Sequence, residues 1–269
     1  MTVLVASAQL QLSVGSVAAN RAAGLRAVEE AAAAGARLVV LPELSDTGYV
    51  LADRAEATAL SDHTATLQGW ASAAVRLGVV IVGGLCVVDD DGSIRNAAAV
   101  VDPSGVRTSY SKAHLWDAEP DVFLPGDLPP PVVDTPAGRV AVMVCYDLEF
   151  PEWVRTAAEA GAEILAVPVN WPLLTQPPPG QRPIEVVKAQ AAAATYGVWI
   201  VVADRCGPER GVDWVGGSVV VDPDGYPVAG PAAPGAPALL VADIDPARAR
   251  DKSIGARNHR VHDRRPALY

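Results

Sequence analysis

The stretch VMVCYDLEFPE, residues 142–152, decides the fold of this chain. It begins as an apolar run, turns at Cys145 and ends with a proline followed by an acid, both of which favour the first turn of a helix. We therefore expect a strand at 140–144, a sharp turn and a helix at 152–160. This elbow places the Cys145 thiol at the carboxyl edge of a sheet, where ligands bind in open α/β folds.

Strands and helices alternate on either side of this elbow, which is typical of α/β proteins whose internal strands are covered on both faces. The order of elements in the first half recurs in looser form in the second, without a strict sequence repeat. The proline-rich segments 129–131 and 172–183 cannot extend helices or fill central strands, so we expect surface loops there. Strands are expected at 2–9, 37–41, 79–88, 97–101, 140–144, 164–168, 198–203 and 215–221, and helices at 17–34, 64–77, 152–160 and 184–196.

The composition excludes several classes of partner. Half of the 269 residues are apolar, which suits one large domain or two fused halves, and we expect a single domain over residues 1–269. The net charge of −10 comes with no basic stripe for nucleic acid. The sequence opens without a basic leader, and no apolar stretch approaches the roughly 20 residues that cross a bilayer. We expect a soluble cytoplasmic protein that binds neither nucleic acid nor membrane.

Neither a metal nor a cofactor is expected. The cysteines Cys86, Cys145 and Cys206 are far apart and lack C-x-x-C spacing, and no His/Cys/Asp cluster has the spacing of metal ligands. No G-x-G-x-x-G or G-K-[ST] loop is present to hold phosphates. Cys145 is therefore either a small buried hydrophobe, as cysteines often are, or a nucleophile that a base or cation activates.

Two other charged residues follow apolar or extended segments. Glu43 ends the run LVVLPEL, and a buried acid is costly unless it is paired or used. Lys112 is one of only three lysines among the 21 Lys and Arg residues. Lysine is a compact cation whose pKa can be tuned, and it can stabilise an oxyanion. The plain alternatives are a loop acid at Glu43 and a lysine kept by chance at Lys112.

Together the three segments resemble the nitrilase superfamily of carbon–nitrogen hydrolases, whose members carry a Glu-Lys-Cys triad. The motifs are LPEL-x-x-TGY around Glu43, SK-x-HL followed by E and F-x-PG-D around Lys112, and CYD-x-x-FPE around Cys145. The resemblance continues through VPVNWP, ADRCGPERG, WVGGSVVVDPDG and DRRPALY, and so covers essentially the whole chain. It implies an α/β fold of the four-layer α-β-β-α sandwich type.

The resemblance also implies the chemistry. Glu43 would act as general base toward the Cys145 thiol, which attacks the carbonyl carbon of a small-molecule amide and forms a thioester. Lys112 and the backbone N–H of Tyr146 would hold the oxyanion. Glu119 matches a second glutamate that has a supporting role beside the lysine and the nucleophile.

The substrate is less constrained by the sequence. Loops after strands are expected to line the pocket, and Glu149 is either a solvated acid of the elbow or a partner for a cationic substrate group. The residues expected to contact substrate are Tyr49, Glu149, Asn170 and Trp171.

Other activities use the same triad. Carbamoyl-amine hydrolysis is one alternative, and nitrile hydrolysis is another. Nitrilases of the superfamily typically follow the cysteine with Trp-Glu, whereas this chain has Tyr146-Asp147, as amidases do. A binding or scaffold protein without turnover is a third alternative, which the intact triad residues disfavour.

We also expect a homodimer or larger homo-oligomer. The arginine-rich segment 246–269 ends in the apolar residues Ala267, Leu268 and Tyr269, which is unusual for a free tail. The superfamily resemblance implies association through the helices near the elbow.

Overall fold

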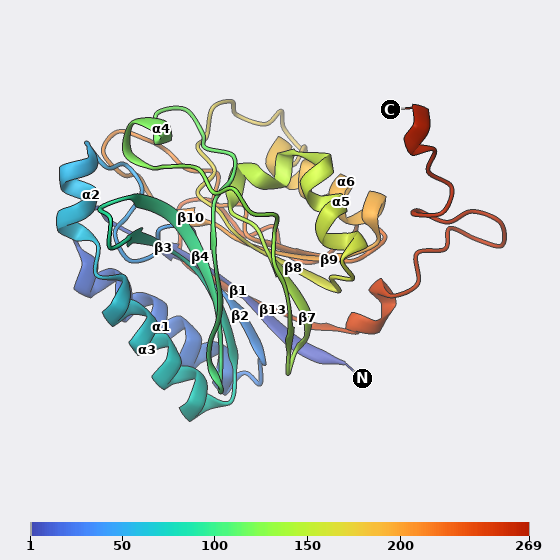
Figure 1. Ribbon diagram of the computed structural model, residues 1–269, viewed down its shortest axis with the longest axis horizontal. Coiled ribbons are helices and arrows are strands. Elements are labelled where there is room, and N and C mark those ends of the chain that lie inside the picture. The colour runs from blue at the N-terminus through green and yellow to red at the C-terminus, as the bar shows by residue number, and fades with distance from the viewer. Residues whose placement is uncertain (1, 269) are drawn as a thin grey trace.

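Two β-sheets packed face to face, with a pair of helices on each outer side, make up the computed structural model, which describes residues 2–268 (Figure 1). The first sheet has the order β10-β1-β2-β3-β4-β5, and β13 also pairs with β1. Its strands are β10 (Arg205–Cys206), β1 (Val3–Gln11), β2 (Leu38–Val40), β3 (Val80–Val88), β4 (Ile94–Asp102), β5 (Gly105–Ser111) and β13 (Ala238–Ile244).

The second sheet has the order β12-β11-β9-β8-β7-β6, and β7, β8 and β9 run parallel to one another. Their carboxyl ends therefore meet at one edge, which is where the elbow begins. The strands are β12 (Pro227–Ala229), β11 (Val219–Val221), β9 (Trp199–Ala203), β8 (Ile164–Pro168), β7 (Gly138–Val142) and β6 (Val132–Thr135).

The outer layers are helical. Helices α1 (Val17–Ala33) and α3 (His63–Leu77) cover the first sheet, and α5 (Pro151–Glu159) and α6 (Ile184–Tyr196) cover the second (Figure 1). The expected α-β-β-α arrangement is confirmed. Shorter helices lie in the connections: α2 (Arg54–Leu60), α4 (Glu119–Val122) and the 3₁₀ turns η1 (Cys145–Glu149), η2 (Pro246–Ala249) and η3 (Pro266–Leu268).

Alternation of side chains along the strands of the first sheet produces two separate cores. Successive residues of a strand point to opposite faces. In β1, Val5 packs between the sheets, whereas Ala6 and Ala8 pack under α1 and α3. In β2, Leu38 faces the second sheet and Val39 faces the helices. This burial of both faces explains why the strands read as nearly continuous apolar runs.

Most of the predicted elements are confirmed, with shifts at their ends. The helix at 184–196 has the expected bounds, those at 17–34 and 64–77 differ by one residue at one end, and the one expected at 152–160 is shifted by one residue at both ends. The strand expected at 140–144 is β7, which ends at Val142, and the strand expected at 215–221 is only β11, Val219–Val221. The segment 172–183 contains no helix or strand, as expected for a loop.

The C-terminal segment leaves the sandwich after β13 and runs along the side that carries α5 and α6 (Figure 1). Lys252 Nζ donates to the carbonyl oxygen of Gly197, and Arg260 Nε donates to that of Ala194, so the segment is attached to the end of α6. Tyr269, part of the apolar end noted in the sequence, lies outside the described residues. Within residues 2–268, no helix is long and apolar enough to cross a membrane.

Candidate active site

Cys145 lies at the sharp turn between β7 and α5. Its φ of 48° falls in the left-handed region, which costs a non-glycine residue on the order of 1–2 kcal/mol. The side chain of Asp147 stabilises the turn, because its Oδ2 accepts the backbone N–H of Val144 at 3.1 Å while its own N–H donates to the Val144 carbonyl at 3.0 Å. The predicted elbow is therefore present, with a 3₁₀ turn as its bend.

Glu43 follows β2 and is fully buried. The loop that carries it packs directly against β3, where a Cβ on Gly84 would lie 2.4 Å from the Cα of Glu43. Only glycine permits this close approach. The next residue, Leu44, has a φ of 44°, so the backbone turns sharply just after the carboxylate.

Lys112 follows β5 and brings two acids together. Its Nζ donates to Glu43 Oε1 at 2.8 Å and to Glu119 Oε1 at 2.7 Å, and the lysine side chain is fully buried. Asn96, from β4, donates from Nδ2 to Glu43 Oε1 at 2.7 Å and to Glu119 Oε1 at 3.3 Å. Tyr49 Oη also donates to Glu119 Oε1, at 2.8 Å.

These contacts leave one oxygen of Glu43 unused. Oε1 accepts from both Lys112 and Asn96, whereas the buried Oε2 has no hydrogen-bond partner among residues 2–268. A buried acceptor without a donor is costly, and such atoms in native proteins call for a functional or structural reason. The free Oε2 can accept a proton.

Cys145 and Glu43 are linked through Asn170, which follows β8. The Cys145 thiol donates to the Asn170 carbonyl oxygen at 3.8 Å, and Asn170 Nδ2 donates to the Glu43 carbonyl at 2.8 Å. The second bond fixes the orientation of the amide, because a flipped amide would place two oxygens against each other. The Oδ1 atom of Asn170 is buried and has no partner within residues 2–268.

The electrostatics of the cluster follow from its burial. Burial raises the pKa of Glu43 above its ordinary value, although Lys112 acts in the opposite direction. Burial would lower the pKa of Lys112, but the two carboxylates outweigh it and raise that pKa. Burial, with the charge of Glu43, holds the pKa of the Cys145 thiol well above its usual range. At neutral pH the thiol is protonated and the lysine is charged.

A small cavity of about 70 Å³ opens onto the thiol. Aromatic and apolar side chains form most of its wall, and three charged residues complete it. It is lined by Trp116, Cys145, Tyr146, Glu149, Asn170, Trp171, Pro172, Leu174, Glu185 and Lys188. A second cavity of about 270 Å³, lined among others by Tyr49, Glu119 and Trp214, shares Trp116, Pro172 and Leu174 with it.

The structure therefore places the predicted site residues in different surroundings. Asn170, Trp171 and Tyr146 line the thiol cavity, and the backbone N–H of Tyr146 takes part in none of the hydrogen bonds within residues 2–268. Tyr49 lines the second cavity instead. Glu149 lines the thiol cavity but is paired, because Lys188 Nζ donates to its Oε2 at 2.6 Å.

Several residues of the site were not foreseen from the sequence. Asn96 lies mid-strand in an alanine-rich segment, and Glu185 and Lys188 lie one turn apart at the start of α6, where charged residues are ordinary. Asp147, by contrast, belongs to the elbow motif and was expected to organise the turn, and its bond from the Val144 N–H agrees with that role. The proline that precedes α6 and ends the loop 172–183 was the one signal that could have placed Glu185 near a pocket.

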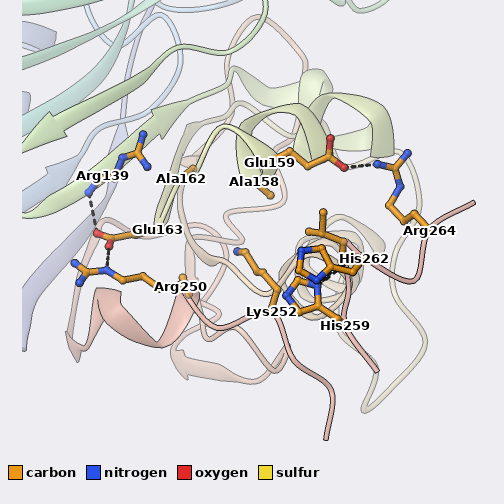
Figure 2. A pocket seen from close by; sticks show the side chains of 13 residues that line it. Arg139, Ala158, Glu159, Ala162, Glu163, Arg250, Lys252, His259, His262 and Arg264 are labelled. Atoms are coloured by element: carbon orange, nitrogen blue, oxygen red, sulfur yellow. Dashed lines mark hydrogen bonds and ion pairs between the residues drawn. The ribbon is translucent and has the colours of Figure 1, made fainter. Parts of the chain in front are cut away.

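A wider cavity lies elsewhere in the molecule. It has about 540 Å³ and lies between the end of α5 and the C-terminal segment (Figure 2). Its acids are already paired, Glu159 with Arg264 and Glu163 with Arg250, and no cysteine lines it. The thiol cavity is therefore the better candidate for chemistry. Among the described residues no group of His, Cys, Asp and Glu could hold a metal ion.

Comparison with known proteins agrees with this geometry. Residues 4–252 match the model of the carbon-nitrogen hydrolase family. A protein of Pyrococcus abyssi named nitrilase is 37% identical over 245 residues, or 90% of this chain and 89% of that protein. An (R)-stereoselective amidase of a Pseudomonas species is 33% identical over 189 residues, or 70% of this chain and 66% of that protein.

A solved structure is similar over almost the whole chain. It is a mutant of the amidase from Nesterenkonia sp. AN1, with the acetamide moiety of fluoroacetamide covalently added at its active site cysteine. It has 29% sequence identity and a TM-score of 0.83, and the match covers 99% of this chain and 95% of that one.

Proposed function

This chain belongs to the carbon-nitrogen hydrolase family of the nitrilase superfamily, and from that premise we propose that it hydrolyses a small-molecule primary amide to a carboxylic acid and ammonia. Glu43, Lys112 and Cys145 are the proposed triad. The product of the first half of the reaction is a thioester on Cys145. The comparisons support an enzyme of this class, since the similar proteins are named amidases and hydrolases.

The observation that carries the proposal is the free Oε2 of Glu43. A protonated thiol is a poor nucleophile, so it needs a base within the same buried cluster. Glu43 is that base: Lys112 and Asn96 occupy its Oε1, and its unpartnered Oε2 accepts the thiol proton. Because burial raises the pKa of Glu43, the proton transfer from sulfur is less unfavourable than it would be to an ordinary carboxylate.

The first half-reaction forms a bond between Cys145 Sγ and the carbonyl carbon while Glu43 takes the thiol proton. The carbonyl oxygen gains negative charge, which the Lys112 ammonium and the backbone N–H of Tyr146 stabilise. Collapse of the tetrahedral species breaks the carbon–nitrogen bond, and Glu43 returns its proton to the departing nitrogen. Ammonia leaves, and the acyl group remains on Cys145 as a thioester.

The second half-reaction repeats these roles with water. Glu43 removes a proton from a water molecule that attacks the thioester carbonyl, and Lys112 again faces the oxyanion. Breaking the carbon–sulfur bond releases the acid, and the thiolate recovers the proton from Glu43. The proposal needs no cofactor or metal, and it requires a reduced thiol, for which we propose a cytoplasmic location.

The neighbouring residues have supporting roles in this proposal. Glu119 fixes Lys112 through a 2.7 Å bond and is itself fixed by Tyr49 and by the backbone N–H of Trp116 at 2.9 Å. Asn170 and Trp171 form the wall of the substrate cavity beside the thiol. Tyr49 therefore acts on the substrate through Glu119, not by lining the thiol cavity.

Nitrile hydrolysis is the second candidate, and the relative named nitrilase favours it. Attack on a nitrile gives a thioimidate nitrogen that must be protonated, whereas attack on an amide gives an oxyanion at once. A charged lysine and a fixed N–H suit the oxyanion. Amide hydrolysis is therefore the better match to this cluster.

The test compares matched amides and nitriles of two to five carbons at equal concentration, with ammonia release as the readout. We expect the amides to react faster and the thioester to be trapped on Cys145 by mass spectrometry. Cys145→Ala should abolish turnover, and Glu43→Gln and Lys112→Ala should each cost several orders of magnitude in rate. The double variant Glu43→Gln/Lys112→Ala should be little less active than either of its single variants, because groups of one catalytic triad act as a unit.

Two results would contradict this assignment in different ways. Faster consumption of the nitriles across all chain lengths would overturn the amidase proposal and leave the triad. More than a tenth of wild-type activity in Cys145→Ala, checked for correct folding by circular dichroism, would overturn Cys145 as the nucleophile.

A further inference from the structure

We infer that the substrate is a short amide whose acyl chain ends in a cationic group, and that the carboxylate of Glu185 binds this group. The inference rests on the proposed function and concerns the same cavity. It replaces the expectation from the sequence, in which Glu149 was the possible partner of a cation.

The first argument is the balance of charge around the thiol cavity. Its charged lining residues are Glu149, Glu185 and Lys188, and Lys188 is already bonded to Glu149 at 2.6 Å. The Glu185 carboxylate makes no hydrogen bond or ion pair with any other residue from 2 to 268. Two carboxylates and one ammonium leave a net charge of −1 on the cavity wall. The unpaired carboxylate, that of Glu185, is available to an incoming substrate.

The second argument comes from the inner end of the same cavity. Asn170 lines it, is fully buried, and leaves Oδ1 without a donor within the described part of the chain. Its Nδ2 is bound to the Glu43 carbonyl, so Oδ1 is the atom left to accept a hydrogen bond. The cavity thus has an unsatisfied acceptor near Cys145 and another at Glu185. A ligand that carries N–H donors at both ends satisfies both.

The third argument is size. A cavity of about 70 Å³ corresponds to roughly five water-sized spheres of about 15 Å³ each. It accommodates a chain of a few carbons between the thiol and the outer acids, against the apolar surfaces of Trp116, Trp171 and Leu174. An amide with an amino group three or four atoms from its carbonyl carbon has these dimensions and this charge.

The experiment uses three four-carbon primary amides that differ in charge: 4-aminobutanamide, butanamide and succinamic acid. We expect kcat/KM for ammonia release at pH 7 to decrease in that order. In Glu185→Gln, the ratio of kcat/KM for 4-aminobutanamide to that for butanamide should fall by about 2- to 5-fold, the size of a partly exposed ion pair. Glu152→Gln changes an exposed acid on α5 that lines neither the thiol cavity nor the adjoining one, and it should leave this ratio unchanged.

Binding to Cys145→Ala, measured by calorimetry, tests the charge preference without turnover. Tighter binding of 4-aminobutanamide than of butanamide, lost in Cys145→Ala/Glu185→Gln, supports the inference even if no amide is hydrolysed. Absence of ammonia from all three amides in the wild type would contradict the proposed function alone. Equal binding of the three amides, or a preference for succinamic acid, would overturn the role of Glu185.

Discussion

At Glu43, burial and a neighbouring cation act in opposite directions on one carboxyl group. Burial is the larger effect and raises the pKa, while Lys112 and the hydrogen bond from Asn96 lower it. The proposed mechanism needs this carboxylate ionised before the thiol attacks. The fraction of enzyme with an ionised Glu43 therefore falls as the pH decreases through the pKa of Glu43. The midpoint of the acid limb in the pH profile of kcat/KM should lie above the pKa of about 4.3 of an ordinary glutamate.

Asn96→Ala tests this dependence. The substitution removes a hydrogen bond that favours the charged form of Glu43, so the pKa of Glu43 should rise further and the acid limb should move to higher pH. Measurement of kcat/KM between pH 4 and 9 for wild type and variant checks the shift. A limb that stays in place or moves to lower pH would show that another group governs it.

The sequence predicted the three proposed catalytic residues because each occurs in a family motif, and because Glu43 and Cys145 each follow an expected strand. It could not predict which oxygen of Glu43 is free, since this depends on Asn96 from a distant strand. Nor could it predict that Lys188 is bonded to Glu149, which lies 39 residues earlier in the chain. Such pairings depend on how distant elements pack, for example α6 against the elbow. Packing of this kind leaves no local pattern in the sequence.

At the scale of elements, Asp147 fixes the elbow to the end of β5. Its Oδ1 accepts the backbone N–H of His114 at 3.0 Å and contacts His114 Nδ1 at 2.7 Å, and its Oδ2 accepts Tyr110 Oη at 2.7 Å. Tyr110 and His114 flank Lys112 in sequence. One buried carboxylate thus sets the position of the loop that carries Lys112 relative to the turn that carries Cys145.

We predict that Asp147→Asn lowers both stability and activity. Asparagine cannot accept all of these donors, so the free energy of unfolding should fall by about 1–3 kcal/mol. The rate constant kcat should fall at least tenfold, because small misplacements of catalytic groups are costly. Urea unfolding and steady-state kinetics measure the two effects. Asp134→Asn, at a side chain that is 85% exposed, is the control and should change neither. Full activity in Asp147→Asn would refute the positioning role.

Elements with clear apolar runs or clear end signals in the sequence were predictable, and elements without them were not. Helix α6 has the expected bounds because Pro183 precedes it and Gly197, in the left-handed conformation, ends it. Strand β5 was missed, since GVRTSYS is polar and contains only one buried residue, Tyr110. Strand β7 ends two residues before the predicted end at 144, because the backbone N–H of Val144 donates to the side chain of Asp147 in the turn.

At the scale of the whole molecule, the two helical layers differ in what lies beside them. The layer of α5 and α6 carries the C-terminal segment beside it and exposes Ile184 and Val187, at 57% and 42%. Exposed apolar residues next to an extended segment suit an interface between subunits. We propose that this side mediates the homodimer or larger assembly expected from the sequence.

Light scattering after gel filtration tests this proposal. We expect a particle at least twice the 27.8 kDa of the chain at micromolar concentration. Val187→Lys should weaken the association, because it places a charge in the interface, whereas Val75→Lys, 63% exposed on α3, should not. A wild-type particle of 27.8 kDa would contradict the proposed assembly.

The aromatic wall of the thiol cavity gives the molecule an optical reporter of its own. Of the six tryptophans, Trp116 and Trp171 line the cavity that contains Cys145, and Trp214 lines the adjoining one. A ligand that displaces water from these indoles changes their intrinsic fluorescence. Binding and acylation can therefore be followed in a stopped-flow instrument on the unlabelled protein, and a Trp116→Phe variant assigns the emission to the cavity.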